Sequence, residues 1–240
     1  WAPGTAPAVN ICTPKPQGLS EYKKRRTGPA STPGKWYSSF SLGTMVLAEY
    51  YPEFAQLIAQ KATEAYQKGM ENPGVCQTSN TVSPYLYEED NWADDMQLAA
   101  AEMFSLTKST ENLNQAVKYG RLEPVTPWMG ADSGGHYQWY PFVNLGHYRL
   151  AKQNVNSRIS REFIRNMRSG LQRVKDRAAG DAFMNGVPFI WCSNNLTVGL
   201  ITQCRLYYEL TGDNTFLEME TAMRDWLFGV NPWGTCMIVG

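Results

Sequence analysis

The chain has 240 residues, of which 43% are hydrophobic, and its formal net charge is zero. This length and composition suit one globular domain with a sizeable core and exclude a disordered chain. The balanced charge gives no broad attraction for nucleic acid or anionic lipid, and no apolar run approaches the roughly 20 residues that cross a bilayer. We therefore expect no nucleic-acid partner and no membrane span.

Residues 1–36 contain six of the fourteen prolines, at positions 3, 7, 14, 16, 29 and 33. Proline fixes φ and removes a backbone donor, so we predict an irregular lead-in over this segment. From residue 37 to residue 240 the apolar pattern is helical, and no strand-like alternation competes with it. The fold class predicted from this pattern is all-α, in a single domain over residues 1–240.

Five apolar stripes at helical spacing follow one another along the chain. They are Phe54, Leu57, Ile58, Ala62 and Ala65; Trp92, Met96, Ala99, Ala100 and Met103; Ile159, Phe163, Met167, Leu171 and Val174; Leu196, Leu200, Cys204 and Tyr208; and Phe216, Met219, Met223 and Leu227. The last two stripes are followed by Gly212 and Gly229, which are typical residues after a helix end. The arginines of the helix from Arg158 to Arg177 flank the third stripe, which predicts a solvated face rather than a nucleic-acid site.

A loose repeat marks the ends of several predicted helices. Leu106-Thr107-Lys108, Leu150-Ala151-Lys152 and Leu210-Thr211-Gly212 each precede a short polar turn and another helix, and Leu47-Ala48 is a weaker instance. Measured from Leu47, the spacings are 59, 44 and 60 residues. Helical hairpins recurring in this way indicate a packed array. Periodicity alone does not separate a closed toroid from an open solenoid.

The segment from Tyr85 to Asp95 is strongly acidic at the start of a predicted helix. Carboxylates there stabilise a helix N-terminus by about 0.3–1 kcal/mol each, and this interpretation is favoured over a carboxylate pair for general acid and base chemistry. Trp92, at the start of the helix, either fills the core or stacks on a sugar ring. Aromatic side chains suit such rings because they combine an apolar face with a polar tip.

Two further segments carry candidate binding residues. His136, Tyr137 and Trp139 follow a glycine-rich stretch, and His136 is as well suited to a sugar hydroxyl as to a backbone carbonyl. With His147 as the only other histidine, the spacing does not indicate a metal site. Trp191 precedes a helix that Ser193 or Asn194 can cap. The five cysteines show no CxxC spacing, so buried reduced thiols are favoured over a zinc or disulfide framework.

Five segments, in their order, resemble glycoside hydrolase family 9. They are KPQGL (15–19), YLYEEDNWADDMQLAAAE (85–102), HYQWYPFVNLGHYRLAK (136–152), VPFIWCSNNLTV (187–198) and WLFGVNPWGTCMIVG (226–240). The last contains a Gly-x-Asn-Pro-x-Gly signature at Gly229, Asn231, Pro232 and Gly234. Five segments in the family's order are more specific than any one of them.

The resemblance implies an (α/α)6 toroid and inverting hydrolysis of β-1,4-glucan or a related β-glucan. The family's catalytic base comes from an N-terminal Asp-rich motif and its acid from a Glu beyond the Asn-Pro signature. Neither motif is in this sequence, so we assign no catalytic residue here and expect an incomplete toroid, a partial catalytic domain with missing segments of the same domain. Because polymeric glucan does not enter cells, a secreted, periplasmic or outer-surface location is expected.

The resemblance also implies the substrate-binding residues. Trp92 and Trp191 correspond to aromatic platforms, His136, Tyr137 and Trp139 to a loop of the same groove, and Asn195 to a hydrogen-bonding group. No cofactor and no metal ligand is predicted, although toroids of this family often bind calcium in loops. Two other hypotheses stay open, a non-catalytic carbohydrate-binding remnant and a helical-repeat scaffold that binds protein.

Overall fold

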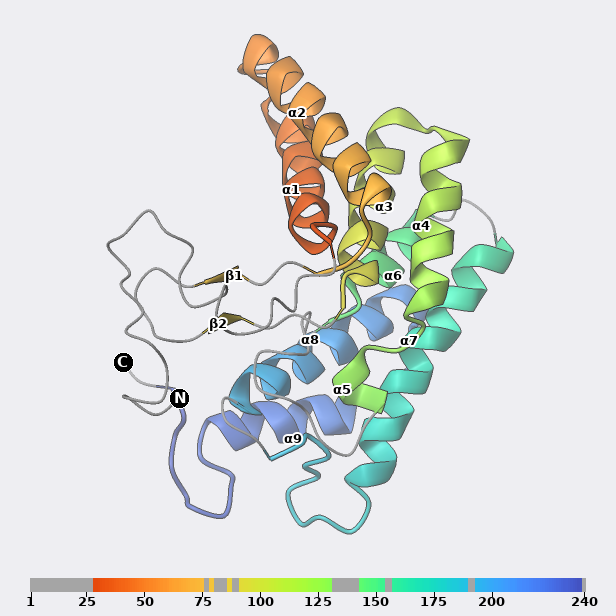
Figure 1. Cartoon of the computed structure of the whole chain (residues 1–240). Coiled ribbons are helices and arrows are strands. Elements are labelled where there is room, and N and C mark those ends of the chain that lie inside the picture. Colours follow the sequence, from red (N-terminus) through yellow and green to blue (C-terminus); the bar gives the residue numbers. More distant parts are fainter. Residues whose placement is uncertain are drawn as a thin grey trace.

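A computed structural model describes residues 28–75, 78–79, 86–87, 91–130, 143–153, 157–189 and 193–238 (Figure 1). In these ranges the chain forms helices almost throughout, with one antiparallel pair of two-residue strands in which Thr78 pairs with Tyr87 and Ser79 with Leu86. The elements are α1 (Ser31–Leu47), α2 (Pro52–Glu71), β1 (Thr78–Ser79), β2 (Leu86–Tyr87), α3 (Ala93–Thr107), α4 (Thr110–Leu122), α5 (Pro127–Gly130), α6 (Leu145–Lys152), α7 (Ser157–Arg177), α8 (Ser193–Thr211) and α9 (Leu217–Leu227).

The longer helices form four hairpins arranged in two rows. The hairpins are α1–α2, α3–α4, α6–α7 and α8–α9, with the first at the top of Figure 1 and the last at the bottom. The first members contact one another in sequence, α1 with α3, α3 with α6 and α6 with α8, and make up the inner row. Because each hairpin reverses the chain, the inner helices run in the same direction and begin at the same end of the array.

The sequence repeat coincides with the ends of the inner helices. α1 ends at Leu47, α3 at Thr107, α6 at Lys152 and α8 at Thr211, so the predicted hairpin array is confirmed. Residues 31–36, however, are helical, whereas the sequence predicted irregular structure through residue 36. Pro33 fits there because the first turn of a helix needs no donor from its nitrogen. Residues 1–27 of the predicted lead-in lie outside the described residues.

Most residues of the predicted stripes are buried, but the first stripe is partly wrong. Phe54 and Leu57 are 52% and 50% exposed, and α2 instead packs inward through Ala55, Ile58, Ala62, Tyr66 and Gly69. In the fourth stripe Tyr207 is buried and its neighbour Tyr208 is not. Periodicity fixes the spacing of the buried positions along a helix more firmly than the direction of the helix face.

Two hydrophobic cores hold the hairpins together. The alanine-rich core joins α1, α2, α3, α4, α6 and α7 through buried residues that include Ala62, Ala99, Ala100, Ala116 and Phe163. The methionine-rich core joins α5, α6, α7, α8 and α9 through buried residues that include Met129, Met167, Leu200, Met219 and Met223. Cys204 is a buried free thiol of this second core, as predicted, whereas Cys236 is a free thiol that is exposed.

A buried ion pair fastens α6 to α3. The Glu102 side chain is 1% exposed, and its two carboxylate oxygens accept hydrogen bonds from Nε and Nη2 of Arg149, the second at 2.7 Å. Such a two-point contact fixes both the position and the orientation of the partners. It therefore defines the register between the two inner helices.

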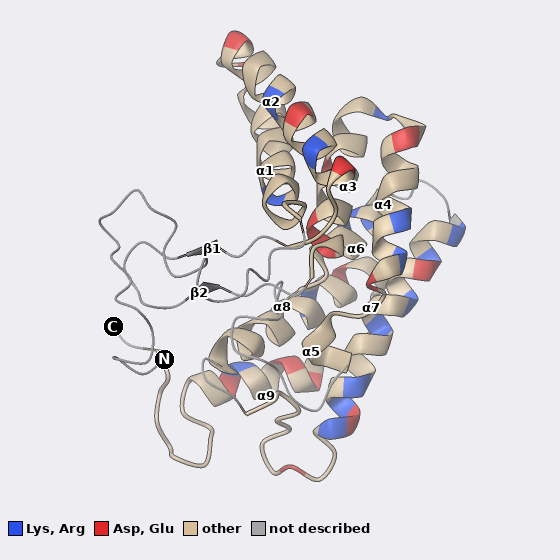
Figure 2. Cartoon of the chain, viewed as in Figure 1, with Lys and Arg blue, Asp and Glu red and all other residues tan. Residues whose placement is uncertain are grey.

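Figure 2 shows basic residues along helix α7, of which Arg158, Arg161, Arg165, Arg168 and Arg173 are exposed. The same helix buries Phe163, Met167, Leu171 and Val174. Its arginine-rich face is thus a solvated surface over an ordinary apolar stripe, as the sequence predicted. None of the helices in the described ranges has the length and apolar character needed to cross a membrane.

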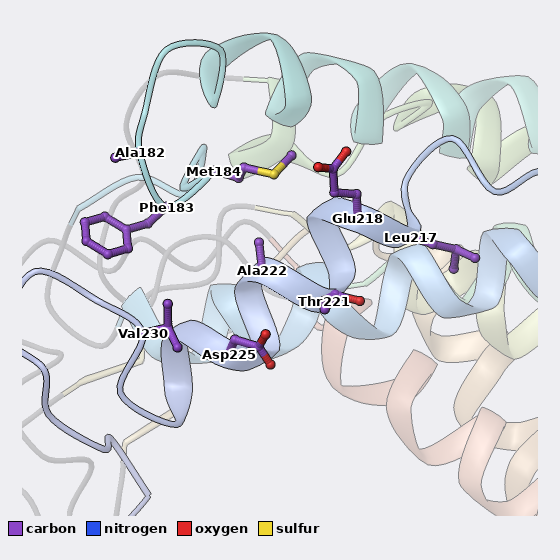
Figure 3. A pocket seen from close by; sticks show the side chains of 9 residues that line it. All are labelled: Ala182, Phe183, Met184, Leu217, Glu218, Thr221, Ala222, Asp225 and Val230. Atoms are coloured by element: carbon purple, nitrogen blue, oxygen red, sulfur yellow. The ribbon is translucent and has the colours of Figure 1, made fainter.

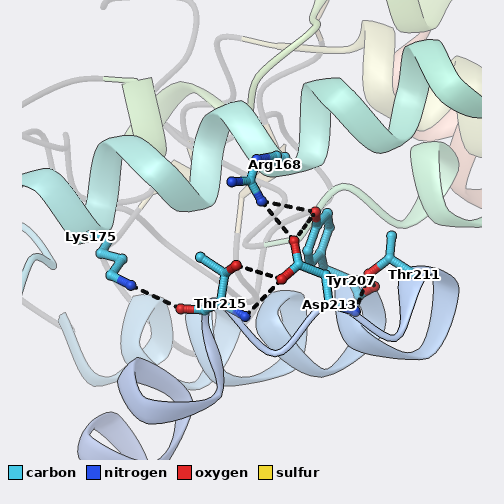
Figure 4. A network of polar contacts seen from close by, with 6 residues as sticks. All are labelled: Arg168, Lys175, Tyr207, Thr211, Asp213 and Thr215. Atoms are coloured by element: carbon cyan, nitrogen blue, oxygen red, sulfur yellow. Dashed lines mark hydrogen bonds and ion pairs between the residues drawn. The ribbon is translucent and has the colours of Figure 1, made fainter.

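Polar contacts also connect α7 with the turn between α8 and α9 (Figure 4). Asp213 accepts hydrogen bonds from Arg168 at 2.8 Å, from the Tyr207 hydroxyl at 3.0 Å and from the Thr215 backbone N–H at 2.9 Å. Lys175 adds a bond of 2.9 Å to the Thr215 carbonyl. The hydrogen bonds that Asp213 accepts, those from Thr215 first, lower the pKa of Asp213 to about 2.

Candidate functional site

In the sequence, the predicted binding residues precede inner helices or lie in their first turn. Trp92 directly precedes α3, and Asn195 lies in the first turn of α8. His136, Tyr137 and Trp139 come before α6 in the sequence, and Trp191 before α8; these four lie outside the described residues. The inner helices begin at one end of the array, and free backbone N–H groups at helix starts can bind polar ligands. That end is the candidate site.

Trp92 is half-buried at the N-cap position of α3. Its ring meets the Tyr119 ring edge-on, with ring centroids 5.7 Å apart, and packs against the alanine-rich core. Trp92 therefore contributes to the core with part of its surface and leaves the rest accessible. Asn195 is exposed, so its amide is accessible to solvent and to ligands.

A polar cluster surrounds Asn91, the residue before Trp92. The Asn91 amide donates to Asp94 Oδ1 at 3.1 Å and to Glu123 Oε2 at 3.1 Å, joining the start of α3 to the end of α4. Burial and, next, the charge of Asp95 raise the pKa of Asp94 well above its ordinary value. Burial also raises the pKa of Glu123 to about 7.

Asp94 and Asp95 make structural contacts within the protein. Asp94 is 8% exposed, which leaves little of its carboxylate accessible to a substrate, and Asp95 forms an ion pair with Lys35 of α1 at 2.7 Å. The geometry agrees with the interpretation of Asp94 and Asp95 as helix-start carboxylates. Glu88, Glu89 and Asp90 of the same segment lie outside the described residues.

His147 is fully buried, next to Phe163. Burial lowers its pKa to about 4, so the ring is neutral and donates from one nitrogen only. Nε2 lies 3.1 Å from the Pro124 carbonyl and donates to it, while Nδ1 lies 2.7 Å from the end of the Gln97 amide. We assign the amide nitrogen of Gln97 to this contact, because that nitrogen otherwise has no hydrogen-bond partner. His147 is thus a structural bridge between α3, α6 and the chain before α5.

The Gly-x-Asn-Pro-x-Gly segment forms a tight turn organised by one side chain. Asn231 is 5% exposed, and its amide nitrogen donates to the carbonyls of Trp226 and Thr235, both at 2.8 Å. Its side-chain oxygen accepts from the backbone N–H of Trp233 at 3.1 Å and of Thr235 at 3.3 Å. The glycines at 229 and 234 have φ of +113° and +59°, which other residues adopt only with strain.

This turn presents an aromatic row that the sequence analysis did not single out. Phe183 meets Trp226 edge-on at 5.8 Å, Trp226 meets Trp233 edge-on at 5.9 Å, and Trp233 stacks with Phe189 at 6.3 Å. The rings come from segments far apart in the chain. The sequence shows that residues 183–189 and 226–233 are both rich in aromatic side chains. It does not show which of these rings contact one another.

A hollow of about 550 Å³ lies between α9 and the chain that follows α7 (Figure 3). Met184 and Phe183 line one side, and Glu218, Ala222 and Asp225 of α9 line the other. It belongs to the outer row of helices, whereas the predicted binding residues precede the inner row. Within the described ranges, no group of three His, Cys, Asp or Glu side chains is arranged to hold a metal ion.

An α/α toroid is built from two rows of helical hairpins, and the hairpins of the described residues have this arrangement. Residues 10–240 match the sequence profile described as glycosyl hydrolase family 9. The chain belongs to this family, and the resemblance of its five segments is confirmed.

The individual relatives are distant. Endoglucanase C of Cellulomonas fimi is 24% identical over 206 residues, covering 82% of this chain and 18% of that protein. Among solved structures, AaCel9A in complex with cellobiose-like isofagomine has a TM-score of 0.70 at 15% identity and covers 88% of this chain. The cellulase Cel9M of C. cellulolyticum has a TM-score of 0.67 at 17% sequence identity and covers 89% of this chain. The Bacteroides ovatus GH9 protein has a TM-score of 0.65 at 15% identity and covers 88% of this chain.

These structures confirm the predicted all-α, (α/α)6 toroid fold class. The chain corresponds to 40% of AaCel9A, 47% of Cel9M and 41% of the Bacteroides ovatus protein. It therefore spans less than half of each of these solved chains.

Proposed function

We propose that this chain is the substrate-groove part of an inverting glycosidase that hydrolyses β-1,4-glucan or a related β-glucan, with endoglucanase-type activity. The observation that carries the proposal is the family match over residues 10–240. The names of the relatives agree with it, since they include an endoglucanase, a cellulase and a complex with a cellobiose-like inhibitor. Polymeric glucan does not enter cells, which supports a secreted, periplasmic or outer-surface protein.

In an inverting glycosidase one carboxylic acid protonates the leaving oxygen while a carboxylate activates water, and the two stand about 6.5–9.5 Å apart. We place both groups in segments of the domain outside these 240 residues. The described carboxylates at the candidate site support this placement, because Asp94 is buried and Asp95 is paired with Lys35. The contribution of this chain is then to bind and orient the glucan.

In this function Trp92 and Trp191 stack on glucose rings, His136, Tyr137 and Trp139 line the same groove, and Asn195 hydrogen-bonds a hydroxyl. The exposed part of Trp92 beside the start of α3 suits this role. An aromatic contact of this kind contributes about 0.5–1.5 kcal/mol beyond its buried area. Several such contacts in a row give a groove that binds an extended, neutral sugar chain.

The test is a calorimetric titration of the 240-residue chain with cellotetraose, followed by a reducing-sugar assay on the same sample. Binding without hydrolysis is expected. Trp92→Ala should weaken binding about fivefold. Phe54→Ala is the matched control, because Phe54 is an exposed aromatic at the opposite end of the α1–α2 hairpin.

Each other outcome contradicts a specific part of the proposal. Hydrolysis by this chain alone would show that its own carboxylates are catalytic and would direct attention to Asp90, Asp94 and Asp95. A folded chain that binds no glucan would favour the helical-repeat scaffold. A longer product of the same gene that binds glucan but never hydrolyses it would be a carbohydrate-binding remnant.

A further inference from the structure

We propose that Phe189 and Trp233, neither of which is among the predicted groove residues, form an additional glucan-contact surface. This inference rests on the proposed function and adds a binding surface to it. Phe189 is 81% exposed and Trp233 is 56% exposed. Their ring centroids are 6.3 Å apart, with planes inclined by 27°, so the two rings stack on each other and form one exposed aromatic pair.

Large aromatic rings exposed to this extent need a structural reason to stay in place. Trp233 is supported from behind by Trp226, which is 7% exposed and meets it edge-on with centroids 5.9 Å apart. Trp226 is itself part of the methionine-rich core. Trp233 therefore contacts the core through Trp226 and is still 56% exposed.

The backbone that carries Trp233 is equally constrained. Asn231 accepts a hydrogen bond from the Trp233 N–H at 3.1 Å and holds the carbonyls of Trp226 and Thr235 at 2.8 Å. A side chain presented by such a turn loses little conformational freedom when a ligand binds. A binding contact is expected to have a backbone held in place in this way. Packing alone does not require it here, because most of the Trp233 ring is exposed to solvent.

The surrounding sequence indicates a neutral ligand. Residues 182–204 and 226–240, the two segments that meet at Phe189 and Trp233, contain no Asp, Glu, Lys or Arg. An anionic polymer would require basic partners, and a cationic one acidic partners. A neutral β-glucan needs neither, because the C–H faces of its rings stack on aromatic faces and its hydroxyls remain hydrated.

The pair is also continuous with the predicted groove along the chain. Phe189 lies shortly before Ser193, the first residue of α8, and the intervening residues include the predicted platform Trp191. Asn195 follows in the first turn of the helix. A glucan held at the start of α8 can thus extend over Phe189 and onto Trp233, which joins the C-terminal turn to the same binding end.

The experiment compares cello-oligosaccharide affinity of the full chain, Phe189→Ala, Trp233→Ala and the control Phe54→Ala, by calorimetry with cellotetraose and cellohexaose. Phe54 is also an exposed phenylalanine, at 52%, but lies at the remote end of the α1–α2 hairpin. We expect Phe189→Ala and Trp233→Ala each to lose affinity about fivefold, more for the longer ligand, while Phe54→Ala binds as the unaltered chain does.

A thermal melt accompanies each variant. If Trp233→Ala unfolds, Phe189→Ala carries the test, because its ring is the more exposed of the two. Unchanged affinity in a folded Phe189→Ala would overturn this inference and leave the proposed function standing. Failure of the unaltered, folded chain to bind either ligand would overturn the proposed function and this inference with it.

Sedimentation tests another occupant of such a surface, a second copy of the chain. Variants that change the oligomeric state but keep their affinity for glucan would make the Phe189–Trp233 surface an interface between copies and overturn the inference.

Discussion

The alanine-rich core and the methionine-rich core pack similar helical hairpins with different side chains. In the first, Ala62, Ala99, Ala100 and Ala116 are fully buried, and the ion pair between Glu102 and Arg149 joins two inner helices. In the second, methionine, leucine and aromatic side chains occupy the corresponding space. Small side chains let helices approach closely, so that polar contacts such as the ion pair fix the register between the helices. Large flexible side chains instead fill irregular space without directional bonds.

The strongest test of this comparison is the ion pair of the alanine-rich core. Arg149→Ala leaves the Glu102 carboxylate buried and unpaired, so we expect a loss of about 3–5 kcal/mol in the free energy of unfolding. Arg121→Ala is the control, because Arg121 pairs with Glu162 on the surface, where such pairs contribute at most about 1 kcal/mol. Urea denaturation measures both variants. Equal losses would show that the buried pair does not define the register.

In the methionine-rich core, Leu200→Ala should cost about 2–5 kcal/mol, because it removes a fully buried side chain and leaves a cavity. Val198→Ala lies on the same helix, 49% exposed, and should change the stability by less than about 0.5 kcal/mol. Thermal and urea unfolding of both variants check the difference. A small loss for Leu200→Ala would mean that neighbouring methionines collapse into the space.

Substitution by leucine should distinguish the two cores. Ala100→Leu forces additional atoms between closely packed helices and should cost about 1–3 kcal/mol. Met219→Leu in the methionine-rich core nearly conserves volume and should cost less than about 1.5 kcal/mol. If the urea midpoint of Ala100→Leu stayed at its original value, the alanine-rich core would have unused space.

The smallest expected effect concerns pH. The raised pKa of Glu123, about 7, means that the folded state keeps its proton longer than the unfolded state does, so its contribution falls as pH rises from about 4.5 to about 7. Asp94, close to Asp95 and Lys35, acts in the same direction. His147 opposes them, since its pKa of about 4 makes stability rise with pH between about 4 and 6.5.

Glu123 and Asp94 together outweigh His147, so the stability of the unaltered chain should fall as pH rises through this window. Glu123→Gln should make this fall in stability smaller, by a change on the order of 1 kcal/mol, because only Asp94 is then left to oppose His147. Melting curves across the window measure this. A slope identical to that of the unaltered chain would show that Glu123 titrates in the folded state as it does in the unfolded one.

Local patterns predicted the scaffold well. The stripes of α3, α7 and α9 and the ends of all four inner helices follow from helical periodicity and from short polar turns, which depend on neighbouring residues. The exposed Phe54 was missed because periodicity does not say which side of a hairpin has a neighbour. The family and its toroid followed from five segments in order.

The candidate site was less accessible from sequence. The platform roles of Trp92, Trp191 and the other predicted residues stay predictions. The network of Asn231 depends on the backbone path of the turn, and the contact between Phe189 and Trp233 joins segments separated by an entire helical hairpin. Likewise, the pKa values of Asp94 and Glu123 follow from burial that only the packing of α3 on α4 creates.

The turn at Asn231 has a consequence for chemical ageing. Asparagine side chains deamidate when the backbone nitrogen of the next residue attacks the side-chain carbonyl carbon, and Pro232 has no N–H with which to do so. Conversion to aspartate here would replace an amide donor by an oxygen facing the carbonyls of Trp226 and Thr235, which now lie 2.8 Å away. Pro232 thus prevents deamidation of Asn231, the side chain that fixes the geometry of the turn. The position of Trp233 should therefore be kept for longer than that of a ring in a loop whose asparagine precedes a residue with an N–H.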